Sequence, residues 1–118
     1  MIQFIRLDHV LLCIPEGATA QARAFYGGVL GLDEIPGNHP SGAIWFQIAD
    51  IQLHLREEAG GNYSKRHPAF EIANLDEAKQ YLMNKGIDIE YSSDIDGRER
   101  FFFRDPFDNR IELLQFVD

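Results

Sequence analysis

Four polar residues stand out because each lies in a stretch that otherwise has the pattern of a strand. Glu112 alternates with large apolar residues in the run 110–116, and alternate side chains of a strand share one face. A carboxylate among apolar neighbours is costly to remove from water unless a cation meets it. His9, Gln52 and His67 lie in similar runs. Neutral imidazoles and a carboxylate are groups that bind divalent metal ions.

The first half of the chain has the pattern of a strand, a helix and a hairpin. Residues 7–14 are apolar and β-branched, as in a strand. Residues 17–32 change to apolar residues at helical spacing, and Gly31 is a suitable end for that helix. Residues 42–57 predict two strands joined by a tight turn near residues 49 and 50.

The second half repeats this order. Asn74 and Glu77 have the spacing of a capping box, which predicts the start of a helix. The sequence predicts a strand at 67–73, a helix at 74–86, and further strands at 87–91, 98–104 and 110–116.

The repeat superimposes the four polar residues. His9 and His67 each open the first strand of their half, and Gln52 and Glu112 lie in the last strands at nearly equal separations from them. If the sheets curl so that these faces converge, the four side chains point into one cavity. Two imidazoles and a carboxylate suit Zn²⁺, Mn²⁺, Fe²⁺, Ni²⁺ or Co²⁺ and leave positions for water or substrate.

The pieces "LDHVLL", "ARAFYGGVLGL", "IQLHL", "HPAFEIANLDEA" and "FFFRDPFDNRIELLQ" occur in this order over residues 7–116. In this the chain resembles the vicinal oxygen chelate superfamily, which includes glyoxalase I, fosfomycin- and bleomycin-resistance proteins, methylmalonyl-CoA epimerase and extradiol dioxygenases. The resemblance implies an α+β fold of paired βαβββ modules whose curled mixed sheets surround a central cavity. We expect one domain over 1–118, with module one at about 5–57 and module two at about 66–117.

The resemblance also implies a divalent metal ion bound by His9, His67 and Glu112, with Gln52 at a variable fourth position. His54 lies two residues after Gln52 on the same strand face. It could replace Gln52 as a ligand or act as an acid or base beside the metal. Glu112 and His54 are therefore the candidate catalytic residues.

A second group of residues is expected to bind substrate. Alternation along 98–104 places Arg100 and Phe102 on one face with a further arginine, and such a face is not plain core. A guanidinium there favours a substrate with carboxylate, phosphonate or enediolate character. Trp45 and Arg56 are further candidates. The alternative is that Arg100 forms an ion pair with a nearby glutamate, Glu71 or Glu99.

Composition excludes several classes of protein. The 118 residues are 45% hydrophobic and 25% charged, as in an ordinary globular domain. A net charge of −8 argues against nucleic-acid binding, which needs a dense basic patch. No run reaches the roughly 20 apolar residues of a membrane span. The single cysteine excludes an internal disulfide, and with no export signal it favours the cytoplasm.

The sequence thus predicts a metal-dependent lyase, isomerase or dioxygenase acting on a small oxygen-bearing molecule, either anionic or neutral. The alternative is a metal-free drug- or metabolite-binding protein of the bleomycin-resistance type. Two open-edged modules in a short chain also predict a homodimer, because exposed strand edges need cover. Whether one chain or two completes a site, and whether Gln52 or His54 is the fourth ligand, are both open at this point.

Overall fold

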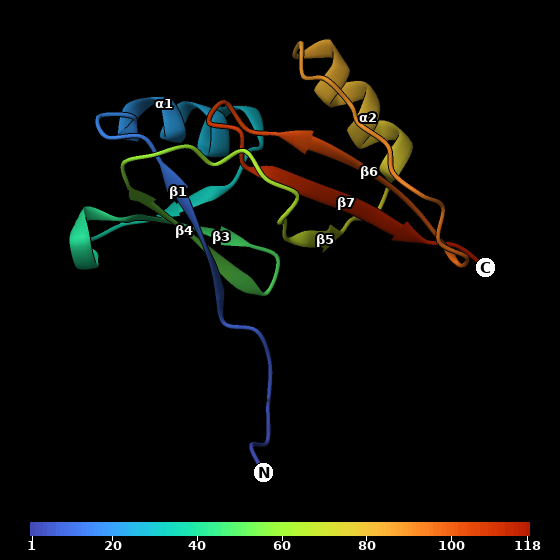
Figure 1. Ribbon diagram of the computed structural model, residues 1–118, viewed down its shortest axis with the longest axis horizontal. Helices are drawn as coiled ribbons and strands as arrows, with labels where there is room; N and C mark the ends of the chain where they lie inside the picture. The colour runs from blue at the N-terminus through green and yellow to red at the C-terminus, as the bar shows by residue number, and fades with distance from the viewer. The chain divides into compact units, whose positions relative to one another are not determined.

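The fold is α+β, as predicted. A computed structural model describes all residues of the chain, which divides into two compact units, Met1–Gly60 and Gly61–Asp118. Each unit contains one mixed sheet and few helical turns (Figure 1). No helix has the length and apolar character needed to cross a membrane. The grouping of both modules into one domain stays a prediction.

The first unit has the predicted strand, helix and hairpin, and a further short strand that the residue pattern did not predict precedes the hairpin. Its sheet runs β1-β4-β3-β2, with β1 parallel to β4 and the other neighbours antiparallel. Ala49 forms the predicted hairpin turn with a positive φ of 49°. The elements are β1 (His9–Ile14), α1 (Thr19–Arg23), η1 (Ala24–Val29), β2 (Asp33–Ile35), η2 (Pro40–Gly42), β3 (Ile44–Ile48) and β4 (Ile51–Glu57).

The helix of the first unit widens after one turn. From Ala24 it is a π-helix, and the Leu30 N–H donates to the Phe25 carbonyl at 2.9 Å. Phe25 and Tyr26 are buried, and the Tyr26 ring lies 6.2 Å from the ring of Phe46 on β3. The helix therefore covers the apolar face of the sheet and leaves the other face to its polar residues.

The second unit contains β5 (Ala69–Glu71), α2 (Leu75–Asn84), β6 (Arg98–Arg104) and β7 (Arg110–Phe116). Its sheet order is β5-β7-β6, with β5 parallel and β6 antiparallel to β7. The capping box is confirmed in part, since the Glu77 N–H donates to Asn74 Oδ1 at 3.0 Å. The Leu75 N–H donates to Gln115 Oε1, so α2 begins on the Gln115 face of β7.

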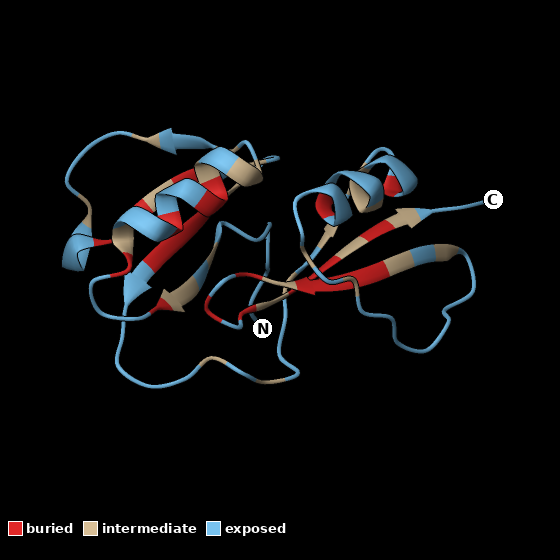
Figure 2. Ribbon diagram, turned by 90° about the horizontal axis from the view of Figure 1, so that it is seen from above, coloured by how far each residue is buried: buried red, intermediate tan, exposed pale blue.

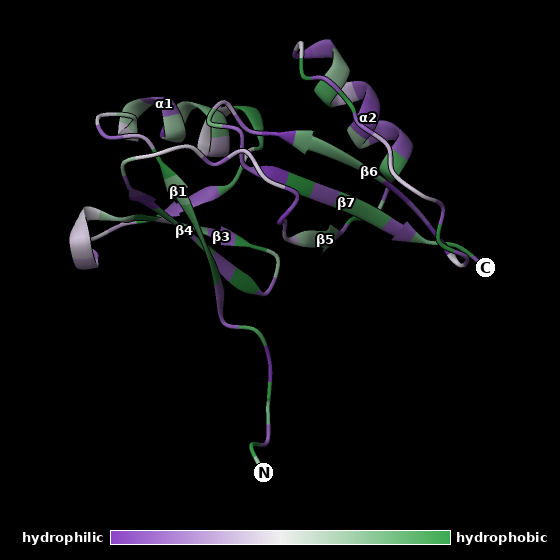
Figure 3. Ribbon diagram, viewed as in Figure 1, coloured by the Kyte–Doolittle hydropathy of each residue, from purple (hydrophilic) through white to green (hydrophobic).

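The predicted strand at 87–91 is wrong. Only Glu90 pairs with β6, through two backbone hydrogen bonds of 2.8 Å to Phe102. The polar, glycine-containing run that follows has no apolar face to bury, so pairing stops after one residue. In Figure 2 the buried residues of this unit lie mainly along β6 and β7, and Figure 3 shows that both strands carry hydrophobic as well as hydrophilic residues.

The first eight residues form no helix or strand. They run away from the sheet of the first unit (Figure 1). Apolar side chains in this segment are in water, with Phe4 89% and Ile5 94% exposed. Contiguous exposed apolar side chains are typical of interaction surfaces.

Candidate functional site

His9 is held in one tautomer by its neighbour. The parallel pairing of β1 and β4 places His9 opposite Gln52. The His9 Nδ1–H donates to Asp8 Oδ2 at 2.9 Å, because a carboxylate only accepts. This hydrogen bond is the main reason that the pKa of Asp8 is lowered. His9 Nε2 is therefore left with a lone pair, as in a metal-binding histidine oriented by a carboxylate.

Gln52 is oriented by His54. The His54 Nε2–H donates to Gln52 Oε1 at 2.9 Å, which leaves a lone pair on His54 Nδ1. His54 is only 9% exposed. Its burial, and next the neighbouring His9, lower the pKa of His54. At neutral pH this imidazole is therefore uncharged and able to accept a proton.

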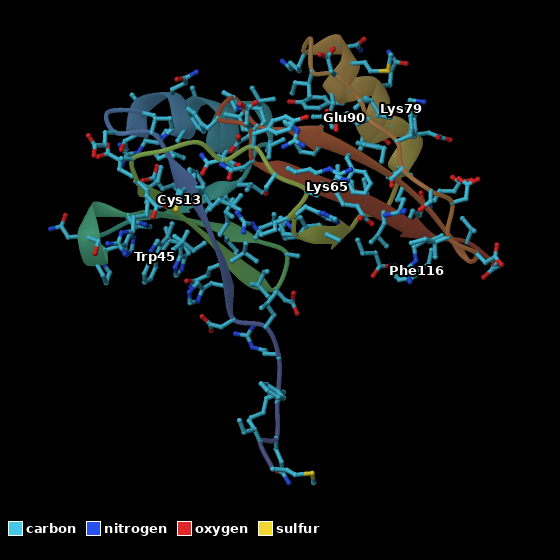
Figure 4. The ribbon with its side chains drawn as sticks, viewed as in Figure 1. Cys13, Trp45, Lys65, Lys79, Glu90 and Phe116 are labelled. Atoms are coloured by element: carbon cyan, nitrogen blue, oxygen red, sulfur yellow. The ribbon has the colours of Figure 1, made fainter.

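Four rings form a continuous stack on this face of the first unit. Centroid separations are 4.1 Å from His9 to His54, 4.0 Å from His54 to Trp45, and 4.0 Å from Trp45 to His39. Trp45, labelled in Figure 4, thus has a histidine ring on each face. It can offer a ligand its edge but not a face on which to stack.

Glu112 meets a guanidinium and an imidazole in the second unit. Its Oε1 lies 3.2 Å from an Arg100 Nη1 donor and 3.0 Å from His67 Nε2. Glu112 is only 4% exposed, so these contacts offset the loss of hydration that its apolar surroundings impose. The Arg100 ion pair is thus with Glu112 and not with the other glutamates considered from the sequence.

His67 has an acceptor at each ring nitrogen. Its Nδ1–H donates to the Lys65 carbonyl oxygen at 2.8 Å. Lys65 precedes β5 and is labelled in Figure 4. His67 Nε2 then faces Glu112 Oε1 at 3.0 Å, and both of these atoms carry lone pairs. Two lone pairs at this distance repel unless a proton or a metal cation lies between them, so this pair fits a metal ion.

The predicted substrate-binding residues differ in how they are held. Arg100 also donates from Nη2 to the Ser93 carbonyl at 2.6 Å, so both of its terminal nitrogens have protein partners. Phe102 is 1% exposed and its ring makes an edge contact of 4.9 Å with the ring of His67. Phe102 therefore packs against the His67 ring and holds it in place. Arg56 is exposed near the end of β4.

Each unit by itself brings together two of the four predicted metal ligands: His9 with Gln52, and His67 with Glu112. No cluster of three His, Cys, Asp or Glu side chains is present. Sequence reasoning missed Asp8, although its place directly before His9 was a usable signal. It also missed the Lys65 carbonyl, which no side-chain pattern indicates.

The chain has two sheets built from related modules. In each, a histidine at the start of the first strand or just before it lies close to a Gln or Glu on the parallel neighbouring strand, and this arrangement defines a two-module α+β protein of the glyoxalase type. The family model of the Glyoxalase/Bleomycin resistance protein/Dioxygenase superfamily matches residues 6–113. The chain belongs to this family.

Solved structures agree with this assignment. A protein from Bacillus anthracis assigned to the glyoxalase family is 37% identical, covers 99% of this chain and 100% of its own, and has a TM-score of 0.88. The genomically encoded fosfomycin resistance protein FosX of Listeria monocytogenes is 20% identical, with coverages of 98% and 96% and a TM-score of 0.78. A FosX variant solved with Mn(II) and 1S,2S-dihydroxypropylphosphonic acid is 19% identical, with coverages of 98% and 95% and a TM-score of 0.81. No curated protein matched the chain.

Proposed function

We propose that the protein is a metal-dependent enzyme of the glyoxalase and dioxygenase type that acts on a small oxygen-bearing molecule. One observation carries the proposal. His9 and His67 both donate Nδ1–H to an oxygen of the protein, so that Nε2 of each is left to bind a cation. The family relationship supports it, as do the FosX structures that contain Mn(II).

The proposed metal ligands are His9 Nε2, His67 Nε2 and a Glu112 oxygen, with Gln52 as the fourth. The hydrogen bond from His54 favours Gln52 over His54 in that place. An amide oxygen has two lone pairs, so Gln52 Oε1 can accept from His54 and still coordinate a cation. His54 then orients a ligand, as metal-site histidines and their partners commonly do.

A bound divalent ion would polarise a substrate oxygen as a Lewis acid. The chain's own residues supply the rest of the chemistry. His54 is neutral and buried, and its Nδ1 accepts a proton from the substrate and returns it. Glu112 is fixed by Arg100, so its carboxylate does not rotate away during the reaction. These roles suit a lyase, an isomerase or a dioxygenase.

Thermal unfolding with and without added metal tests this function. Zn²⁺, Mn²⁺, Ni²⁺ or Co²⁺ should raise the unfolding temperature, because an ion at 100 times its Kd stabilises a fold by about 2.7 kcal/mol. His67→Ala should remove the shift. His39→Ala is the matched control, since His39 also stacks in an aromatic contact but binds no proposed ion. An unchanged shift in His67→Ala would reject the ligand assignment.

The metal-free binding protein has less support from the site. A protein that sequesters a flat drug needs an open aromatic face, and both faces of Trp45 are covered by histidines. Phe102 is buried under other side chains. The same metal titration separates the two functions, because a protein of this second kind would show no shift.

We also infer a homodimer. The exposed apolar segment of residues 1–8 is continuous with β1, which lies at the edge of its sheet. A free strand edge beside exposed apolar side chains is suited to pairing with another chain. A second copy of this chain is the partner that a cyclic two-fold assembly provides.

A further inference from the structure

The sheet face that carries Glu112 also carries an unusual concentration of positive charge. The chain has 11 lysines and arginines against 19 acidic residues. Four of the 11 share this face of β6 and β7 with Phe102 and Glu112: Arg98, Arg100, Arg104 and Arg110. The Nε of each of the four is buried and has no hydrogen-bond partner. Buried donors of this kind are unfavourable unless an acceptor reaches them.

Two of these arginines have a carboxylate partner. Arg100 donates to Glu112 at 3.2 Å. Arg104 lies 3.7 Å from Glu90, the residue labelled in Figure 4 that forms the single bridge to β6. The charges of Arg100 and Arg104 are therefore compensated within the protein.

Arg110 has no carboxylate partner. Its one hydrogen bond is a long one of 3.4 Å, from Nη1 to the Lys65 carbonyl oxygen. The guanidinium carbon lies 3.8 Å from the centroid of Phe102, so the group is held flat against that ring. Arg110 therefore presents a fixed and uncompensated positive charge.

This charge lies beside the proposed metal ligands. The Lys65 carbonyl that accepts from Arg110 also accepts from His67, and the Phe102 ring that Arg110 covers also contacts His67. A guanidinium held in a plane can donate two parallel hydrogen bonds to a carboxylate, phosphonate or phosphate. These groups are acceptors only, and the terminal nitrogens of Arg110 make only one long hydrogen bond within the protein, so they can donate to such a group.

We propose that Arg110 binds an oxyanion group of the substrate, and that the substrate is a small acid with a carboxylate, phosphonate or phosphate near its reacting oxygen. The substrate class rests on the proposed function, since it places the reacting oxygen at His67 and Glu112. The anion site itself does not depend on a metal. Arg110 is a specificity-determining residue in this assignment, and Arg100 is the residue that holds Glu112.

The experiment is an NMR titration of the metal-free, full-length protein. The ¹⁵N–¹H signals of the arginine Nε groups are followed while acetate or inorganic phosphate is added. We expect the Arg110 signal to shift and saturate with one of these anions. Arg110→Gln should weaken binding by at least about tenfold, as expected when a charge-assisted hydrogen bond is lost. The anion that saturates at the lower concentration identifies the carboxylate or the phosphate class.

Two further variants keep the test decisive. Arg98→Gln, which changes an arginine of the same face that lies over Phe116, should bind the anion like the parent. Arg110→Lys retains the charge without the planar fork and should bind with intermediate strength; it decides the matter if Arg110→Gln does not fold. Equal, non-saturating shifts of all four arginines, or parent-like binding by both Arg110 variants, would overturn the proposal. Anion binding without any metal binding would instead reject the proposed enzyme and leave the anion site standing.

Discussion

Glu112→Gln isolates the charge of the buried carboxylate, because glutamine keeps its shape. In the parent, Glu112 Oε1 lies within hydrogen-bond distance of Arg100 and His67, at 3.2 and 3.0 Å, and the side chain is only 6% exposed. Hydrogen bonds to charged groups contribute about 1.5–3 kcal/mol and neutral ones about 0.5–1.5 kcal/mol. Loss of the charge at two such contacts should therefore destabilise the metal-free protein by about 2 kcal/mol.

This free energy corresponds to a measurable decrease in the unfolding temperature. The entropy of unfolding is about 2.1 cal/mol/K per residue, or about 0.25 kcal/mol/K for a chain of this length. A loss of about 2 kcal/mol then lowers the unfolding temperature by about 8 °C. Glu112→Ala leaves Arg100 without its carboxylate and should be worse, by about 3–5 kcal/mol, as when one partner of a buried ion pair is removed.

The assay is thermal unfolding of parent and variant by circular dichroism, in chelator and then with Mn²⁺. Glu71→Gln is the matched control, since Glu71 is an exposed carboxylate on the neighbouring strand β5 and should change little. Metal should raise the unfolding temperature of the parent and of the control, but not that of Glu112→Gln. A metal-free Glu112→Gln as stable as the parent would refute the energetic reasoning. A full metal shift in Glu112→Gln would refute the ligand assignment.

Three other outcomes are expected. Because a cation at His67 Nε2 and Glu112 Oε1 competes with protons for the same lone pairs, metal binding should release protons, which calorimetry in two buffers of different ionisation enthalpy measures; no buffer dependence would contradict this. Burial lowers the pKa of His54 below its ordinary 6.5, so its contribution to stability is complete above that pH and is lost as the pH falls through the folded-state pKa. Urea unfolding from about pH 7 to 5 should show this decline, and His54→Gln should reduce it. Deletion of residues 1–7 should convert a dimer to a monomer by light scattering; a parent that is already monomeric at micromolar concentration would exclude the dimer.

Much of the fold could be predicted because alternation and turn chemistry are local. The hairpin turn at Ala49 and the Asn74 cap are short-range features, and the structure contains both. The placement of Arg100 and Phe102 on one face of a strand followed from the period of a strand alone, and the Arg100 guanidinium lies over the Phe102 ring. The π-helix after Ala24 could not be predicted in this way, because its wider hydrogen bonds have no distinct residue pattern.

The partners of the site residues depend on strand register, which composition does not specify. Phe102 lies directly across from Glu112, and this register places Arg100 where it can reach the carboxylate. The tautomers of His9 and His67 depend on which oxygen each Nδ1 finds. One of these oxygens is a backbone carbonyl that every residue has, so only the structure identifies it.

The central claim is that His67 and Glu112 belong to a divalent metal site. A titration of chelator-treated protein with Mn²⁺, followed by the loss of the electron paramagnetic resonance signal of the free ion, tests it directly. The parent should bind one ion per chain with saturation, and His67→Ala and Glu112→Gln should each lose most of this affinity. Free Mn²⁺ signal that rises in proportion to the added metal in the parent, up to millimolar concentrations, would contradict the claim.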